Sequence, residues 1–393
     1  MPTPPVHHVA FDEFGQFVDR PGFDALLAEA ADAPTDVFLL SHGWNNSSAD
    51  ASQLYAGLLG QMTTVADAVP DLRPPGYLPL AVGVIWPSKA WDEEADSNEG
   101  LNEAVYESLS PARASPAGFR HDVLRVAQLV TADRLAGRDL EEFRSLLRRH
   151  AEPPAEADDR GRFDPNASDE ALEGLGSSAR DVFRAFTYWQ MKKRAGVVGA
   201  IGVRVAAVAL QARFPNARLH LVGHSFGCKV MLAAVAGPGE PLPKPVQTLV
   251  LLQGAVSYEA MAETVSGTTS PGGYRDAVDV ARVAGPIVAS FSRLDKACGQ
   301  AYPLASRVAN QTGELEGLLD RFRALGAVGA SGVRDDLDRG SPAMLDVGTA
   351  YGFTGTGVWS VDGGTGASAF ITGHSVIQTP QVAWLIWSAV RRR

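Results

Sequence analysis

Ala217-Arg-Leu-His-Leu-Val-Gly-His-Ser-Phe-Gly-Cys-Lys-Val-Met231 is the stretch that decides the fold. Its first part is rich in apolar residues and predicts a strand, and Cys228 to Ala236 predict a helix. The turn between them has the pattern Gly-x-Ser-x-Gly, from Gly223 to Gly227. A strand, a sharp turn of this pattern and a helix are together typical of a serine that projects from the edge of a sheet as a nucleophile.

The residue types in this turn have a physical reason. Ser225 must adopt a strained backbone conformation to project its hydroxyl from the sheet. Gly223 and Gly227 have no Cβ atoms, so the strand and the helix can approach closely on either side of the serine. The helix directs its first N–H groups and its positive dipole end toward any oxyanion formed there. We therefore interpret Ser225 as a nucleophile rather than as part of a plain glycine-rich turn.

Strands and helices alternate on both sides of this stretch. Apolar runs predict further strands over residues 36–41, 78–86, 246–252, 286–292 and 357–361, and a short strand or hairpin over residues 8–18. Helices are predicted over residues 21–31, 47–68, 197–214, 315–325 and 381–391. This alternation favours right-handed crossovers and a mostly parallel central sheet flanked by helices. The expected fold class is α/β.

Residues 88–195 have a different character. Strand-like runs are missing there, and helical periodicity appears over residues 119–136, 140–149 and 179–194. The connectors are polar and rich in proline, as in residues 152–160. We interpret residues 88–195 as a helical cap inserted above the sheet, and residues 1–87 and 196–393 as the core.

A serine hydroxyl needs a general base, and the base needs an orienting carboxylate. Asp295 follows the strand predicted over residues 286–292, at the edge where sites on parallel sheets assemble. His374 is the only histidine after Asp295, and we expect His224, inside the turn, to pack beside the site instead. Ser225, Asp295 and His374 thus occur in the order that a hydrolase triad on this kind of sheet requires. The competing carboxylates are Asp276, Asp279 and Asp346.

A second donor to an oxyanion is expected in the loop after an early strand. His42-Gly43-Trp44 follows the strand predicted over residues 36–41, and Gly43 permits close approach of the backbone. The N–H of Trp44 can therefore pair with the N–H of Phe226 to form an oxyanion hole. The alternative is a simple turn before a helix.

These motifs resemble those of the α/β-hydrolase superfamily, and specifically of a lipase- or esterase-like serine hydrolase. The resemblance covers about residues 36–87 and 196–393, and rests on the Gly-x-Ser-x-Gly turn and the His42-Gly43-Trp44 segment. That segment departs from the run of three glycines in some lipases. The resemblance implies cleavage of carboxylic esters through an acyl-enzyme, with Ser225, Asp295 and His374 as the triad. It implies no metal and no cofactor.

Aromatic residues near the expected site suggest an apolar acyl pocket, although each of them is as well explained by core packing. The expected substrate-binding residues are Trp86, Trp91, Tyr188 and Trp189. A small-molecule or lipid ester is the expected partner. The alternatives are a lipase or phospholipase that uses the insertion as a moving lid at lipid surfaces, a thioesterase or amidase, and a non-catalytic binding module of the same fold.

The composition of the chain argues against several other classes of protein. The 393 residues carry a net charge of −10, from 35 Lys and Arg against 45 Asp and Glu, which argues against a binder of nucleic-acid backbones. Cys228 and Cys298 lie in no zinc-binding pattern. No secretory leader is recognised, and the longest apolar run, residues 197–212, is too short to span a bilayer. We therefore expect a cytoplasmic protein without stable membrane insertion.

Overall fold

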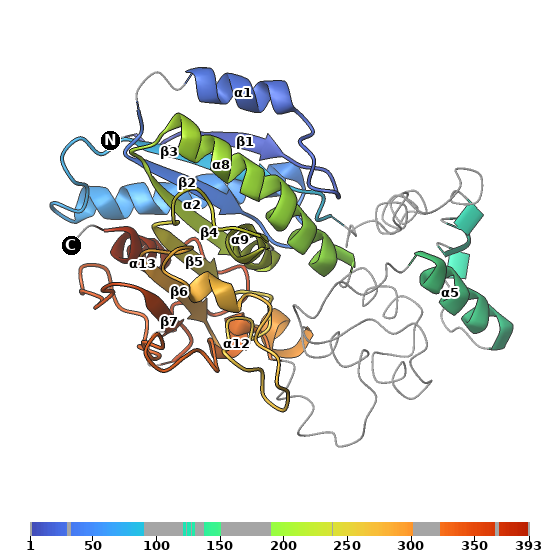
Figure 1. Cartoon of the computed structure of the whole chain (residues 1–393). Coiled ribbons are helices and arrows are strands. Elements are labelled where there is room, and N and C mark those ends of the chain that lie inside the picture. The colour runs from blue at the N-terminus through green and yellow to red at the C-terminus, as the bar shows by residue number, and fades with distance from the viewer. Residues whose placement is uncertain are drawn as a thin grey trace.

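The computed structural model describes residues 2–29, 33–89, 121–122, 124–126, 128–129, 137–150, 190–237, 239–301, 323–365 and 369–391 (Figure 1). Its centre is a seven-stranded sheet in which every pair of neighbouring strands is parallel. Helices flank this sheet, so the α/β class predicted from the sequence is confirmed.

The seven strands match the predicted apolar runs closely. They are β1 (Val6–Ala10), β2 (Asp36–Ser41), β3 (Pro79–Ile85), β4 (Arg218–His224), β5 (Thr248–Leu252), β6 (Pro286–Phe291) and β7 (Gly357–Asp362). Their order across the sheet is β1-β3-β2-β4-β5-β6-β7. The strand before the serine, β4, is therefore the central one, between β2 and β5. Residues 11–17 form the predicted hairpin after β1, through a bridge between Phe11 and Phe17.

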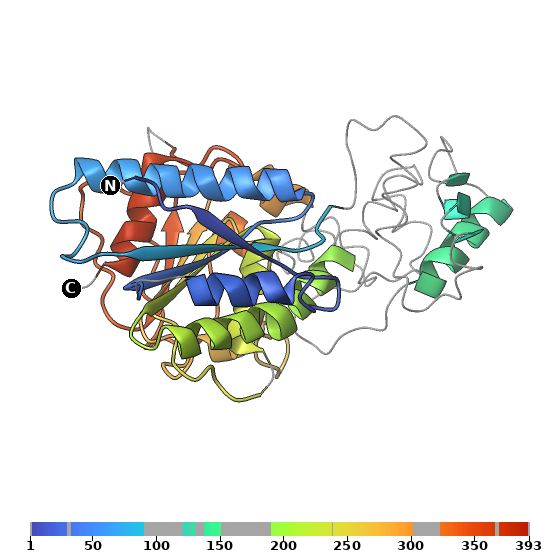
Figure 2. The same ribbon diagram turned by 90° about the horizontal axis from the view of Figure 1, so that it is seen from above.

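Helices cover both faces of the sheet (Figure 2). α1 (Arg20–Glu29), α8 (Arg204–Arg213) and α9 (Phe226–Ala236) lie on one face, and α2 (Ser48–Ala68) and α13 (Pro380–Val390) lie together on the other. Successive side chains of β5 alternate between the two layers: Leu249 and Leu251 pack under α9, whereas Val250 and Leu252 pack under α13. Burial on both faces explains why a strand such as β5 is a nearly continuous apolar run.

The two helices of the second layer have clear start signals. Ser47 caps α2 in a capping box, in which its hydroxyl accepts from the Asp50 N–H and the Asp50 carboxylate accepts from the Ser47 N–H. Thr379 caps α13 by accepting from the Val382 N–H, with Pro380 at the first helical position. Both caps fix the helix ends that lie next to the carboxyl edge of the sheet.

A long apolar helical stretch leads into β4. Its middle, η2 (Val198–Val203), is π-helical, and α8 continues it. A Cβ atom at Gly199 would lie 2.2 Å from the backbone oxygen of Val230, so this glycine lets the stretch pack directly on α9. In the part of the chain that the structure describes, Gln190–Arg213 is long and apolar enough to cross a membrane, and half of its most apolar window is buried within the protein.

Only parts of the predicted insertion are described. Residues 121–122, 124–126 and 128–129 are helical, as is α5 (Gly137–His150), and Arg125 forms ion pairs with Asp139 and Glu142 of α5. The rest of residues 90–189 and most of the helix predicted over residues 315–325 lie outside the described residues. The division into core and cap therefore stays a prediction. The remaining short helices are η3 (Arg275–Val278), η4 (Ala297–Ala301) and α12 (Leu325–Val328).

Candidate active site

The turn between β4 and α9 is strained at Ser225, which has φ 57° and ψ −123°. This conformation is uncommon for a residue with a side chain and typically costs about 1–3 kcal/mol. Its neighbours show why glycine is needed on both sides. A Cβ at Gly223 would lie 2.4 Å from the backbone oxygen of Gly227, and a Cβ at Gly227 would lie 2.1 Å from that of Ser41. The two glycines thus let strand and helix meet, and the packing around them holds the serine in its strained conformation.

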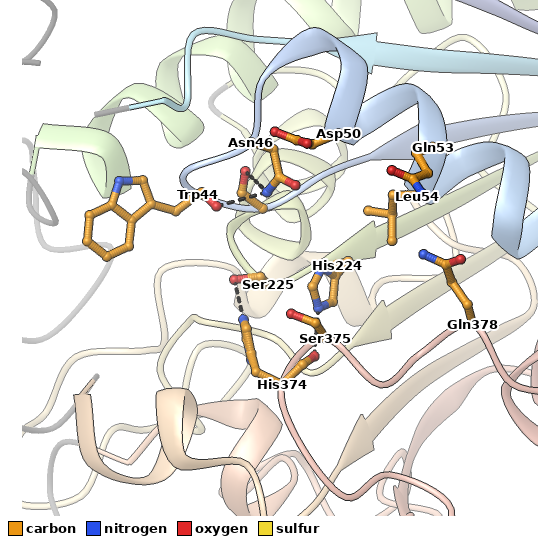
Figure 3. Close-up of a pocket in the computed structure, with 11 residues that line it drawn as sticks. Trp44, Asn46, Asp50, Gln53, Leu54, His224, Ser225, His374, Ser375 and Gln378 are labelled. Carbon is orange, nitrogen blue, oxygen red and sulfur yellow. Dashed lines mark hydrogen bonds between the residues drawn. The ribbon is translucent and has the colours of Figure 1, made fainter. Parts of the chain in front are cut away.

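Three side chains from distant parts of the chain meet at the carboxyl edge of the sheet. Ser225 follows β4, Asp295 follows β6, and His374 lies between β7 and α13. The Nε2 atom of His374 is 2.8 Å from the Ser225 hydroxyl (Figure 3). Its Nδ1 atom is 2.8 Å from an Asp295 carboxylate oxygen. The sequence predicted these three positions, and the structure joins them in one continuous hydrogen-bonded chain.

The carboxylate of Asp295 is fully buried, yet several donors satisfy it. The Cys298 N–H and the Gln253 side-chain amide donate to it, both at 2.9 Å, besides the His374 imidazole. Burial disfavours the ionised form, but the hydrogen bond from His374 and these further donors outweigh it and lower the pKa of Asp295 below its ordinary value. Asp295 is therefore an anion at neutral pH.

The anion fixes the tautomer of His374. Since a carboxylate only accepts hydrogen bonds, Nδ1 of the imidazole must carry the proton that it shares with Asp295. Nε2 is then the acceptor, and the hydroxyl of Ser225 donates to it. The proton that a base must remove from the Ser225 hydroxyl thus already lies in a hydrogen bond to Nε2 of His374, the atom that can accept it.

His224 holds the loop that carries His374. Its Nε2–H donates to the backbone oxygen of His374 at 2.9 Å, and the two rings lie 5.0 Å apart. Burial, with the nearby His374 imidazole, lowers the pKa of His224 to about 3, so its ring is neutral near pH 7. The sequence indicated that His224 packs beside the site. The hydrogen bond shows that its ring also positions the backbone of His374.

The loop after β2 passes directly over the serine. A Cβ at Gly43 would lie 2.6 Å from the Cβ of Ser225, so only glycine fits at this closest point. The rings of Trp44 and Phe226 pack against each other, with centroids 6.4 Å apart. The two residues predicted to supply the oxyanion donors are therefore neighbours in space, on either side of Ser225.

Buried polar contacts hold this loop in place. The backbone N–H of His42 donates to the Tyr55 hydroxyl, and the Nε2 atom of its ring accepts from the N–H of Trp86. The Asn46 amide donates to the backbone oxygen of Trp44 at 2.8 Å. Burial lowers the pKa of His42 to about 4, so this ring is neutral as well. The contacts named here all join uncharged groups.

A cleft of about 200 Å³ opens beside the serine. Its described lining residues are Gly43, Trp44, Asn46, Asp50, Gln53, Leu54, His224, Ser225, His374, Ser375 and Gln378. Figure 3 shows the indole of Trp44 turned away from Ser225, which leaves a largely polar wall along α2 and the segment before α13. The described part of the cleft is therefore more polar than the aromatic residues of the sequence suggested.

Trp86 is the one predicted substrate-binding residue that the structure describes. Trp86 is buried, its ring stacks on His42 with centroids 5.4 Å apart, and its indole N–H donates to the backbone oxygen of His42. It supports the loop from behind and is not among the residues that line the cleft. Trp91, Tyr188 and Trp189 lie outside the described residues.

Sequence reasoning missed Gln253 in the site. This residue follows β5 with a left-handed φ of 47°, and it is fully buried. Its side-chain nitrogen donates to Asp295 and to the backbone oxygen of Gly326, and its side-chain oxygen accepts from the Ser290 hydroxyl. A polar residue at the carboxyl end of a central strand was the signal that could have found it.

One group of donor atoms has the spacing of a metal site. The ligand atoms of Asp295, Cys298 and His374 lie within 4.8 Å of one another in the described part of the chain. The carboxylate and the imidazole already share a proton, and the Sγ atom of Cys298 lies 3.7 Å from Nδ1 of His374. A metal ion there would have to displace the proton that orients the imidazole.

Comparison of the chain with protein-family models, with curated proteins and with solved structures gives no match.

Proposed function

We propose that this chain is a serine hydrolase of the α/β-hydrolase superfamily that cleaves carboxylic esters through an acyl-enzyme. One observation carries the proposal: a strained serine, an imidazole and a buried carboxylate are linked by two contacts of 2.8 Å. This is the arrangement that nucleophilic catalysis by serine needs, whatever the fold.

The first half of the reaction forms a covalent intermediate. Ser225 attacks the ester carbonyl while Nε2 of His374 takes its proton. The imidazolium that results is stabilised by Asp295, which remains ionised and keeps its hydrogen bond to Nδ1. The carbonyl oxygen becomes an oxyanion, and His374 then gives its proton to the departing alkoxide, which leaves as an alcohol.

The oxyanion is stabilised by the N–H groups of Phe226 and Trp44. Phe226 is the first residue of α9, so its N–H and the positive end of the helix dipole both face the reacting centre. The close approach of Gly43 to Ser225 supports the assignment of the Trp44 N–H as the second donor. A donor of this kind typically contributes about 3–4 kcal/mol of transition-state stabilisation.

The second half of the reaction restores the enzyme. Water attacks the acyl carbonyl, His374 takes the proton of that water, and a second oxyanion forms on the same two N–H groups. Its collapse breaks the bond to the Ser225 oxygen, which regains a proton from His374. The products are a carboxylic acid and the free serine, and each step uses groups of this chain and water.

The strained serine argues against the alternative of a non-catalytic binding module. A binding protein gains nothing from a backbone conformation at Ser225 that costs about 1–3 kcal/mol. A thioesterase or an amidase would use the same proton path, because the triad does not choose the leaving group. Esters are the simplest class that this arrangement cleaves, and they are the substrates to test first.

Labelling with a fluorophosphonate and hydrolysis of 4-nitrophenyl butyrate test the proposal. Wild-type protein is expected to be labelled at Ser225 and to release nitrophenolate. Ser225→Ala is expected to lose both, with an unchanged melting temperature, because only the nucleophile is removed. Equal turnover by the variant, or folded wild-type protein that is neither labelled nor active, would refute the assignment.

A further inference from the structure

The end of the cleft away from Trp44 carries two side-chain amides. Gln53 comes from α2, and Gln378 comes from the segment just before α13. Figure 3 shows the Gln378 amide directed toward Leu54 and Gln53. Within the described residues neither amide forms a hydrogen bond, and both side chains are exposed to the cleft. Each therefore keeps its full capacity of two donors and one acceptor oxygen.

The absence of a side chain at Gly57 of α2 leaves the space that the Gln378 side chain occupies. A Cβ at Gly57 would lie 1.9 Å from the Oε1 atom of Gln378 and 2.7 Å from its Cδ atom. The amide of Gln378 thus rests on the bare backbone of the helix. Because Gln53 and Gly57 are four residues apart, they lie on one face of α2, and the two amides meet at one end of the cleft.

Gly60 shows that this contact is specific. It lies in the same helix, three residues further on, and a Cβ there would meet nothing within 4 Å. The two glycines of α2 have the same backbone and different surroundings, so one of them can serve as a control for the other.

The charges along the wall limit the kind of group that binds there. The described lining contains no lysine and no arginine, and its one carboxylate, Asp50, is held by Ser47 through the capping box. Among the described lining residues an anionic substituent would find no countercharge and would face Asp50, whose charge Lys89 partly offsets. The volume of about 200 Å³ is below the roughly 300–1,000 Å³ of sites for drug-sized ligands, so the bound group is short.

We propose that Gln53 and Gln378, the latter seated on Gly57, form a hydrogen-bonding subsite that selects short neutral esters carrying a hydroxyl or amide group. This inference rests on the proposed ester hydrolysis and names the substrate class of that same site. The group can belong to the acyl or to the alcohol part of the ester, because the subsite lies in the same cleft as the serine and the amides both donate and accept.

Two matched pairs of esters test the subsite, one for each part of the ester. In the acyl pair, 4-nitrophenyl 3-hydroxybutanoate is compared with 4-nitrophenyl 3-methylbutanoate. In the alcohol pair, 2-hydroxyethyl butanoate is compared with propyl butanoate, with acid release followed by titration. Each pair differs by a hydroxyl in place of a methyl group. One hydrogen bond of about 1 kcal/mol predicts a preference of about five- to ten-fold in kcat/KM for the hydroxylated member of one pair.

The variants separate the subsite from general effects on the fold. Gly57→Ala displaces the Gln378 amide, and Gln378→Met removes it at nearly constant size, so both are expected to bring the ratio within a pair close to one. Gly60→Ala makes the same chemical change in the same helix and is expected to keep the wild-type ratio. Melting temperatures report whether each variant is folded. If Gly57→Ala does not fold, Gln378→Met alone tests the subsite.

The possible results test the subsite and the proposed hydrolase activity separately. A wild-type ratio near one in both pairs, or a preference that survives in folded Gly57→Ala and in Gln378→Met, would overturn the subsite alone. The hydrolysis of 4-nitrophenyl acetate and the labelling of Ser225 report on the proposed hydrolase separately. If both are absent in the wild-type protein, the proposed function fails, and the subsite fails with it.

Discussion

Gly43→Ala is the substitution that probes the reacting centre most directly. A Cβ at this position would lie 2.6 Å from the Cβ of Ser225, 3.0 Å from its Oγ and 3.4 Å from the backbone oxygen of His224. Ordinary contact begins at 3.4 Å, so the new methyl group lies about 0.8 Å too close to the serine. Because the serine is held by its strained turn and by the packing of Gly223 and Gly227, the loop has to move instead.

The expected loss follows from that displacement. Misplacement of reacting groups by about 1 Å can lower a rate by about 10²-fold, which is about 2.7 kcal/mol. We therefore expect kcat/KM for 4-nitrophenyl butyrate to fall by about 30- to 100-fold in Gly43→Ala. The backbone of Gly43 does not have a positive φ, so alanine adds no backbone strain of its own. The melting temperature is expected to change by a few degrees at most.

The assay compares Gly43→Ala with wild type and with Gly60→Ala, which introduces its methyl group into open space. Rates of ester hydrolysis and of fluorophosphonate labelling are measured on the same preparations. Both rates are expected to fall together in Gly43→Ala, since both reactions place an oxyanion under this loop. Activity of Gly43→Ala within two-fold of wild type would show that the loop does not lie over the serine, and the assigned oxyanion hole would be withdrawn.

Two further variants test the groups around the imidazole. Asp295→Asn removes the anion that fixes the tautomer of His374, and kcat in steady-state ester hydrolysis is expected to fall by about 10⁴-fold; more than a tenth of the wild-type kcat would contradict the assignment. His224→Gln tests the buried neutral ring. In the folded state the pKa of His224 is about 3, against 6.5 for the free side chain, so below pH 6.5 the unfolded chain binds a proton that the folded chain does not. Stability from this group is therefore lost as the pH falls toward 3. Between pH 6 and 4, chemical denaturation should show the wild-type free energy of unfolding falling by about 1.4 kcal/mol more per pH unit than that of the variant; parallel slopes would contradict the neutral ring.

Local patterns in the sequence predicted the sheet well. β2, β5 and β6 are largely apolar runs because side chains on both of their faces are buried, and such runs are recognisable without any knowledge of their neighbours. The position of Ser225 was equally local, since the glycines on either side of it and the flanking strand and helix are all within a few residues.

The surroundings of the site could not be predicted in the same way. Gln253 donates to Asp295, which lies 42 positions further along the chain, and no residue near Gln253 in the sequence indicates this partner. The contact between Gly57 and Gln378 could not be predicted from the local sequence either. A glycine within a helix indicates only lower helix stability until the residue that packs against it is known. Trp86 was expected at the cleft because it is aromatic, whereas its ring supports the loop after β2 from within the core.

The distance along the chain between the serine and its base has a consequence for biosynthesis. The two residues are 149 positions apart, and His374 lies just before α13, which anchors the end of the chain to α2 through the bond from the Trp387 indole to the backbone oxygen of Met62. A nascent polypeptide that has completed β4 carries the hydroxyl without any means of deprotonating it. On the proposed function, the triad is therefore complete only after α13 has docked, and a nascent chain that stops before His374 would not attack esters.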